Sequence, residues 1–239
     1  MVHLVLFDID GTLLHTGGAG RKAFRQAFAT AFGVLDATEG MEFAGRTDTS
    51  LVRELFRRHH VDHTIQNVQH FFDTYYFWLD HILSTTPGAP CPHIWEFLAD
   101  LRALPSPPAI GLLTGNVRLG AEIKLRQFRL WQEFCTGGFG DDDEDRSQIA
   151  RIARQRGNEL LGRKLEGDEV LVIGDTPMDI QCAKAISAPC LAVATGSSTV
   201  SELQHHGAAW AVPDLSHLSA ADVCGRRPRP QVQDSSPTT

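Results

Sequence analysis

Residues 2–14 read VHLVLFDIDGTLL, and this stretch decides the fold. The apolar run before Asp8 is typical of a strand that is buried on both faces of a sheet. It ends in Asp8 and Asp10, which are followed by Gly11 and Thr12. A simple Asp-Gly turn at the strand end is one interpretation. Two carboxylates crowded at the end of an apolar strand are costly unless a cation or a proton separates them, so the pair favours a functional site.

Length, composition and charge limit the functions open to this chain. Its 239 residues are 42% hydrophobic and 21% charged, as in a globular protein with room for a core domain and a smaller one. The net charge of −7 argues against nucleic acid as a partner. We see neither a signal peptide nor a membrane span. Five scattered cysteines are typical of free thiols. We expect a cytoplasmic monomer or homodimer that binds neither nucleic acid nor membranes.

Strand and helix patterns alternate along most of the chain, which predicts a mostly parallel sheet. Three consecutive helical patterns interrupt the alternation after the first strand, and their aromatic stripe is interpreted as core packing. The predicted organisation is an α/β core in residues 1–16 and 87–224, a helical insertion in 17–86 and a disordered tail in 225–239. Further strands are expected at 109–114, 134–139, 169–174, 189–193 and 208–212. Helices are expected at 21–32, 45–60, 68–83, 94–104, 119–128 and 147–161, with one more that ends at 185 and another that begins at 201.

Reactive side chains stand just past the ends of three predicted strands. Asp8 and Asp10 follow the first, Thr114 follows a second, and Asp175 and Asp179 follow a third. Ligands of an open parallel sheet bind outside the carboxyl ends of its strands. These side chains are therefore expected to meet in one cleft, although more than a hundred residues separate the first from the last.

Three motifs give the chain a resemblance to a known family. They are DIDGTL at 8–13, LTGN at 113–116 and GDTPMD at 174–179. The chain resembles the haloacid dehalogenase superfamily, whose first, second and fourth motifs these are, and its helical insertion resembles the cap of the phosphoglycolate phosphatase and β-phosphoglucomutase branch. The resemblance implies a Rossmann-like core with an inserted helical cap, and a Mg²⁺-dependent phosphatase that acts on a small phosphorylated metabolite.

The aspartates suit this chemistry. The carboxylate of Asp8 can attack phosphorus and form an aspartyl-phosphate, while Asp10 can protonate the leaving oxygen and then accept a proton from water. Asp8 and Asp175 supply the hard oxygen ligands that Mg²⁺ prefers. The resemblance implies that Asp10 binds the metal through its backbone carbonyl. Asp179 is expected to orient the metal's waters, or else to stabilise the start of a helix.

The second motif is expected to hold the transferring phosphoryl group. Thr114 would donate its hydroxyl, and the backbone amides of Gly115 and Asn116 would assist at the start of a helix. The alternative role for Thr114 is that of a plain helix cap.

The third motif departs from the family pattern, which usually has a lysine at the start of the helix before the fourth motif. Arg146 aligns with that lysine here. Arginine can bridge Asp8 and a phosphoryl oxygen, but it is not equivalent to lysine. Lys164 comes too late in the chain for this role.

The predicted cap suggests a second binding group. Arg46 could reach a distal anion of the substrate, or it could be a solvated arginine at a helix start. The glycine-rich residues 17–20 and the proline-rich residues 87–90 are the two connections on which a lid could close.

Three alternative functions share the predicted core. A phosphosugar mutase would differ mainly in how its cap excludes water. A dehalogenase is disfavoured because that branch lacks the second aspartate of the first motif, and Asp10 is present. A degenerate core that only binds ligands is disfavoured by the intact aspartates, with Arg146 as the one departure in its favour.

Overall fold

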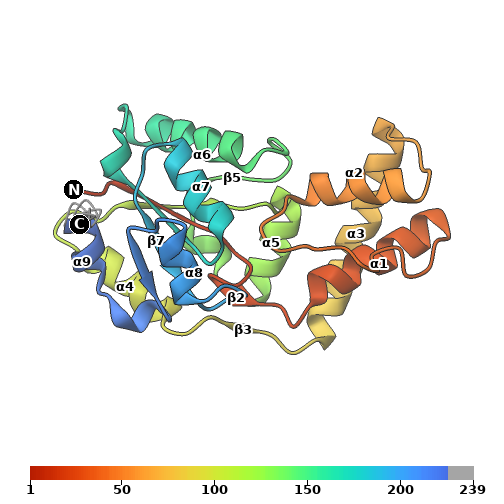
Figure 1. Cartoon of the computed structure of the whole chain (residues 1–239), viewed down its shortest axis with the longest axis horizontal. Helices are drawn as coiled ribbons and strands as arrows, with labels where there is room; N and C mark the ends of the chain where they lie inside the picture. The colour runs from red at the N-terminus through yellow and green to blue at the C-terminus, as the bar shows by residue number, and fades with distance from the viewer. Residues whose placement is uncertain (226–239) are drawn as a thin grey trace, which may run out of the picture.

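The computed structural model describes residues 1–225 and confirms the α/β fold (Figure 1). Its centre is a six-stranded sheet in the order β5-β4-β1-β6-β7-β8, in which every neighbouring pair is parallel. The tail predicted at 225–239 lies outside the described residues except for Gly225, which ends helix α9. The strands are β1 (Leu4–Phe7), β4 (Ala109–Leu113), β5 (Thr136–Gly138), β6 (Val170–Gly174), β7 (Cys190–Val193) and β8 (Trp210–Val212).

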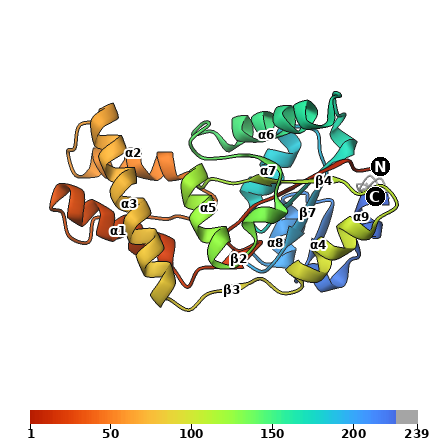
Figure 2. The same cartoon turned by 180° about the vertical axis from the view of Figure 1, so that it is seen from behind.

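Helices cover both faces of this sheet because alternate residues of a strand point to opposite faces. Val5 and Phe7 of β1 belong to the apolar cluster that includes α4, α5 and α9, whereas Leu4 and Leu6 belong to the cluster with α6, α7 and α8. Figure 2 shows the sheet between these layers. The helices are α4 (Ile94–Ala103), α5 (Arg118–Gln127), α6 (Arg146–Leu161), α7 (Pro177–Ala185), α8 (Val200–His205) and α9 (Ala220–Gly225).

The remaining helices, α1 (Ala19–Phe32), α2 (Asp48–Arg58) and α3 (Ile65–Thr85), lie together at one end of the molecule (Figures 1 and 2). The aromatic stripe of α3 packs inside this group: the ring of Tyr75 lies 4.7 Å from that of Phe24, and both side chains are buried. The interpretation of the stripe as core is confirmed for Phe71, Phe72 and Tyr75, whereas Phe77 of the same stripe is exposed. The division into two domains at 16–17 and 86–87 stays a prediction.

All three of these helices begin at other residues than predicted: α1 begins at 19 rather than 21, and threonine caps set the starts of the other two. Thr47 is extended and its hydroxyl accepts from the amide of Ser50, so α2 begins at 48 rather than 45. Thr64 caps α3 in the same way, so α3 begins at 65 rather than 68.

The two connections to these helices run side by side. β2 (Leu14–His15) pairs with β3 (Ala89–Pro90) in an antiparallel ribbon. Gly17 follows with a φ of +61°, and a Cβ there would lie 2.2 Å from the carbonyl oxygen of Pro87. Only glycine fits this close approach.

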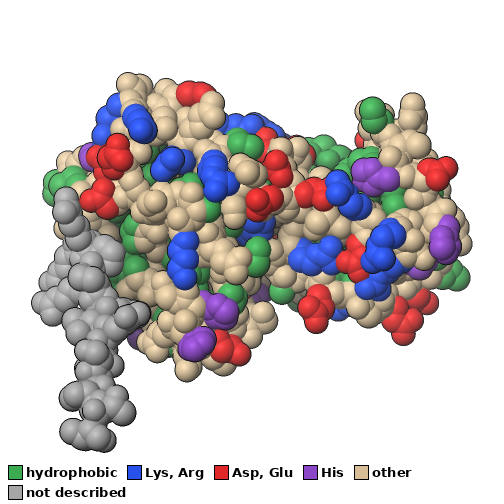
Figure 3. Space-filling model, turned by 45° about the horizontal axis from the view of Figure 1, so that its top comes forward, with side chains coloured by type: hydrophobic (Ala, Val, Ile, Leu, Met, Phe, Trp, Pro, Cys, Tyr) green, Lys and Arg blue, Asp and Glu red, His purple; other side chains and the backbone are tan. Residues whose placement is uncertain are grey.

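Two general properties complete the description. On the face drawn in Figure 3, acidic and basic side chains are interspersed rather than gathered by sign. Among residues 1–225, no helix combines the length and the apolar character needed to cross a membrane.

Candidate active site

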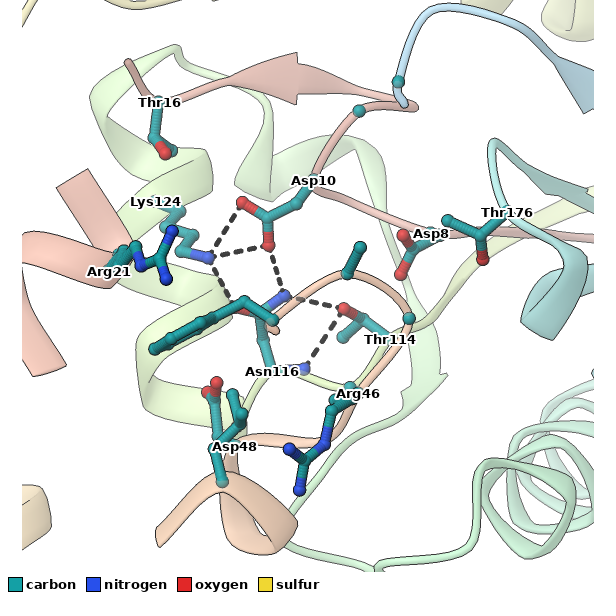
Figure 4. A pocket seen from close by; sticks show the side chains of 18 of the residues that line it. Asp8, Asp10, Thr16, Arg21, Arg46, Asp48, Thr114, Asn116, Lys124 and Thr176 are labelled. Atoms are coloured by element: carbon teal, nitrogen blue, oxygen red, sulfur yellow. Dashed lines mark hydrogen bonds and ion pairs between the residues drawn. The ribbon is translucent and has the colours of Figure 1, made fainter. Parts of the chain in front are cut away.

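A cavity of about 490 Å³ lies between the carboxyl edge of the sheet and helices α1–α3 (Figure 4). Strands β4, β1 and β6 are neighbours in the sheet, so the residues that follow them meet on one side of this cavity. Asp8, Thr114 and Asp175 all line it, as the sequence predicts for one cleft. Asp10, Asn116, Arg46 and Arg146 also line it.

The first group is a cluster of three buried carboxylates, of which Asp8 and Asp175 line the cavity, whereas Asp179, expected in the same cleft, does not. Ligand oxygens of Asp8, Asp175 and Asp179 all lie within 4.8 Å of one another. Burial raises the pKa of Asp8 and of Asp175 well above the ordinary value, and the nearby charge of Asp179 raises both further. Hard oxygen donors and an excess of negative charge fit a divalent cation, so this cluster could bind a metal.

The surrounding chain is shaped to hold this cluster. The hydroxyl of Thr12 donates to Asp175 at 2.9 Å. A Cβ at Gly196 would lie 1.7 Å from the carboxylate of Asp175, so only glycine leaves room there. Asp179 accepts from both the amide (3.0 Å) and the hydroxyl (2.7 Å) of Thr176. Asp179 therefore also caps the first turn of α7, the alternative role considered for it.

Arg146 reaches this cluster from the start of α6. Its buried Nη2 donates to Oδ1 of Asp179 at 2.6 Å and to Oδ1 of Asp8 at 3.3 Å. Its Nε is also buried and has no hydrogen-bond partner within residues 1–225. The guanidinium thus brings its positive charge to two of the three carboxylates, Asp8 and Asp179.

A second network surrounds Asp10 (Figure 4). Nζ of Lys124 donates to both carboxylate oxygens of Asp10, at 2.7 and 2.9 Å, and to Oδ1 of Asn116 at 2.6 Å. Nδ2 of Asn116 donates to Asp10 and to Oγ1 of Thr114, each at 2.8 Å. Burial opposes ionisation of Asp10, but the charge and hydrogen bonds of Lys124 outweigh it and lower the pKa below the ordinary value.

Residues at the start of α2 line the cavity and contact the loop of the second motif. The amide of Asp48 donates to the carbonyl of Gly115 at 2.8 Å, and the carboxylate of Asp48 accepts from the amide of Val117 at 2.9 Å. Burial raises the pKa of Asp48 to about 6, although the charge of Lys124 opposes this. A Cβ at Gly115 would lie 2.2 Å from the carbonyl oxygen of Arg46, so the two loops are in close contact.

The Arg46 side chain lines the cavity but is already paired. Its Nη1 donates to Glu54, and its Nη2 donates to the carbonyl of Ser50 at 3.3 Å. A substrate anion would therefore compete with Glu54 for this guanidinium. The role predicted for Arg46 in binding a distal anion stays a prediction.

Two residues of the site were not predicted from the sequence. They are Lys124 and Asp48. A signal for Lys124 was present: it follows Ala121 and precedes Leu125 on the buried face of α5, where a lysine needs a partner. Asp48 had no such signal, because aspartate in the first turn of a helix is ordinary.

Comparisons with known proteins bear on the family and the fold. A model of the family described as haloacid dehalogenase-like hydrolase matches residues 5–193. No curated protein matches the chain. The structure is similar to those of a predicted phosphoglycolate phosphatase from Haemophilus somnus 129PT (TM-score 0.67, 16% identity, 89% of this chain and 94% of that one), CbbY from Rhodobacter sphaeroides in complex with phosphate (0.64, 17%, 81% and 86%) and a predicted phosphatase from Clostridium acetobutylicum (0.63, 19%, 91% and 96%). At these identities the likeness shows the fold alone.

Proposed function

The chain belongs to the haloacid dehalogenase-like hydrolase family, and we propose that it is a Mg²⁺-dependent phosphatase of a small phosphorylated metabolite in the cytoplasm. The observation that carries the proposal is the surroundings of Asp8. Its carboxylate is buried at the cavity floor, beside one guanidinium and two further carboxylates. A carboxylate nucleophile can displace the leaving group from phosphorus and form an aspartyl-phosphate.

The other charged residues would bind the metal and stabilise the transferring phosphoryl group. A Mg²⁺ ion held by Asp8, Asp175 and the backbone carbonyl of Asp10 would offset the negative charge of the phosphoryl group. Asp179 would orient the water molecules of that ion. Arg146, placed beside Asp8, would stabilise the charge that develops on the phosphoryl oxygens.

The second motif and Asp10 would complete the reaction. Thr114 would donate its hydroxyl to the phosphoryl group, assisted by the amides of Gly115 and Asn116. Asp10 would give a proton to the leaving oxygen and later take one from the attacking water.

The basic side chains that line the cavity indicate which substrates it could bind. Arg46, Lys124 and Arg146 each pair with a carboxylate, and Arg21 lines the same cavity. The guanidinium of Arg21 donates to the carbonyl of Met41 at 2.6 Å and lies 5.2 Å from the ring centroid of Phe43. No carboxylate in the described part of the chain pairs with it. A second anionic group on the substrate would find its charge partner in Arg21.

The test is an assay of p-nitrophenyl phosphate with and without Mg²⁺, followed by a panel of phosphorylated metabolites. We expect turnover that requires the metal, stops with a chelator and returns when Mg²⁺ is added back. Release of inorganic phosphate identifies a phosphatase, whereas transfer of the phosphoryl group to a second position of a sugar would identify a mutase. Absence of both activities in a folded, metal-loaded protein would overturn the proposal.

A further inference from the structure

Lys124 is a buried lysine whose bonds all lead into the cavity. Its side chain is 5% exposed, and within residues 1–225 its hydrogen-bond acceptors belong to two residues, Asp10 and Asn116. A buried ammonium group is costly unless it is paired. This one is paired with both oxygens of Asp10, the carboxylate to which the proposed function assigns proton transfer.

The network around Asp10 restricts the carboxylate from two sides. Lys124, on α5, donates to both oxygens of the Asp10 carboxylate. Nδ2 of Asn116 donates to Oδ2 of Asp10 and also to Oγ1 of Thr114. The Asp10 side chain still keeps 44% of its surface exposed, so it remains open to the cavity while its direction is fixed. The side chain that faces the leaving group is thus oriented before a substrate enters.

The first turn of α1 covers this lysine. A Cβ at Gly20 would lie 3.4 Å from Nζ of Lys124, which is ordinary contact distance. Helix α1 therefore helps to shield the ammonium group of Lys124 from water, while Asp10 stays open to the cavity.

The two buried cations of the site serve different carboxylates. Arg146 donates to Asp8 and Asp179, and Lys124 donates to Asp10. A cation that contacts Asp8 can act on the transferring group in every substrate. Among the carboxylates of residues 1–225, Lys124 donates to Asp10 alone, so its effect on the reaction should follow the role of Asp10.

We propose that Lys124 is a positioning residue, which holds the carboxylate of Asp10 in the orientation that protonates the leaving oxygen. The inference rests on the proposed function. In the first half of the reaction, a bond forms between Asp8 and phosphorus, the bond from phosphorus to the leaving oxygen breaks, and that oxygen takes its electron pair and the proton of Asp10. In the second half, water gives a proton to Asp10 and attacks phosphorus, and the bond to Asp8 breaks to release phosphate.

The test compares leaving groups in wild type and Lys124→Met. p-Nitrophenolate leaves without a proton, whereas an alkoxide needs one, and kcat/KM reports the first half of the reaction alone. General acid–base catalysis contributes roughly 10²–10⁴-fold, so we expect kcat/KM for alkyl phosphates to fall by about that factor. The loss for p-nitrophenyl phosphate should stay within a few-fold. The dependence of kcat/KM on leaving-group basicity therefore becomes steeper.

Four further variants make the result specific. Asp10→Asn should steepen the dependence in the same way, and adding Lys124→Met to it should change the slope no further. Lys124→Arg keeps a charge at this position and should recover part of the loss on alkyl phosphates. Arg126→Met removes a cation of the same helix that pairs with Glu122 at the surface, and it should leave the slope unchanged.

Each alternative result has a distinct meaning. A uniform loss on all leaving groups in a folded Lys124→Met protein would overturn the positioning role. So would a Lys124→Met effect that remains in full when Asp10 is already Asn. A wild-type protein that cleaves none of the esters would overturn the proposed function, and this inference with it.

Discussion

Nη2 of Arg146 lies 2.6 Å from Oδ1 of Asp179, a side chain with no exposed surface. The distance from the same nitrogen to Asp8 is longer, at 3.3 Å. Arg146 therefore pairs with the fully buried carboxylate of Asp179 as well as with the proposed nucleophile, Asp8. Removal of one partner from a buried ion pair leaves an uncompensated charge, which typically costs about 3–5 kcal/mol.

The first prediction follows for Arg146→Ala. We expect kcat/KM to fall by a similar factor for every phosphomonoester, of order 10²–10⁴, because the lost charge acted on the group common to all of them. Denaturant unfolding should show a loss of stability of roughly 3 kcal/mol or more. Arg146→Lys should recover more of the stability than of the rate, since a point charge replaces a planar fork. Normal rates in the Ala variant would show that another cation serves the phosphoryl group.

The second prediction concerns Asp8→Asn. Turnover should be abolished, because the amide cannot form the aspartyl-phosphate. The metal-free variant should melt no lower than wild type at pH 8, since burial and Asp179 make the ionised Asp8 carboxylate unfavourable in the folded state. Beryllium fluoride should protect wild type against unfolding and have no effect on the variant. Residual turnover near the wild-type rate would remove Asp8 from the role of nucleophile.

A third prediction separates the two aspartates of the fourth motif. Asp175→Ala should weaken Mg²⁺ binding in calorimetric titration more than Asp179→Ala does, because Asp179 already bonds to Arg146 and Thr176. Asp179→Ala should instead cost more stability, since it leaves the buried Arg146 without its shorter bond. The reverse order of metal affinities would make Asp179 the direct ligand.

The fold could be predicted because its signals are local. β1 and β6 are short apolar runs, and an aspartate follows each of them directly. The same residues therefore predict where the strand ends and which side chain reaches the cleft. Parallel order followed from the helices between them. The helix starts were predicted less well, because caps such as Thr47 depend on one side-chain hydrogen bond that periodicity does not reveal.

The site was harder to predict where a charged side chain could form an ion pair with more than one residue. Arg46 and Arg146 are both arginines near a helix start, but the first pairs with Glu54, whereas the second pairs with Asp8 and Asp179. Such pairings depend on rotamers and on segments distant in sequence. Lys124 illustrates this most clearly, because its partner Asp10 is 114 residues away.

A fourth prediction compares the two arginines that face the variable part of the substrate. Arg21→Gln should lower kcat/KM for substrates with a second anionic group and spare p-nitrophenyl phosphate, because Arg21 has no carboxylate partner among residues 1–225. Arg46→Gln should have a smaller selective effect, since Glu54 already holds that guanidinium. If only Arg46→Gln is selective, the substrate displaces Glu54 and the original assignment of Arg46 is right.

The last prediction is a pH dependence that belongs to Asp48. Its folded-state pKa is raised to about 6, chiefly by burial, from an ordinary value of 3.8. Between these values the folded protein binds more protons at Asp48 than the unfolded chain does, so the free energy of unfolding falls as pH rises and levels off above pH 6. Asp48→Asn removes this penalty while keeping an oxygen that can accept from Val117.

The difference in unfolding free energy between Asp48→Asn and wild type should therefore be small near pH 4 and grow to at most roughly 3 kcal/mol above pH 6. Taking this difference cancels the similar dependence of Asp8 and Asp175, which both proteins share. Asp48→Ala is the matched control: it also removes the charge but leaves the amide of Val117 without its acceptor, so it should be less stable than Asp48→Asn at every pH. A difference between Asn variant and wild type that does not change with pH would mean that Asp48 stays ionised in the folded protein, with Lys124 as its counter-charge.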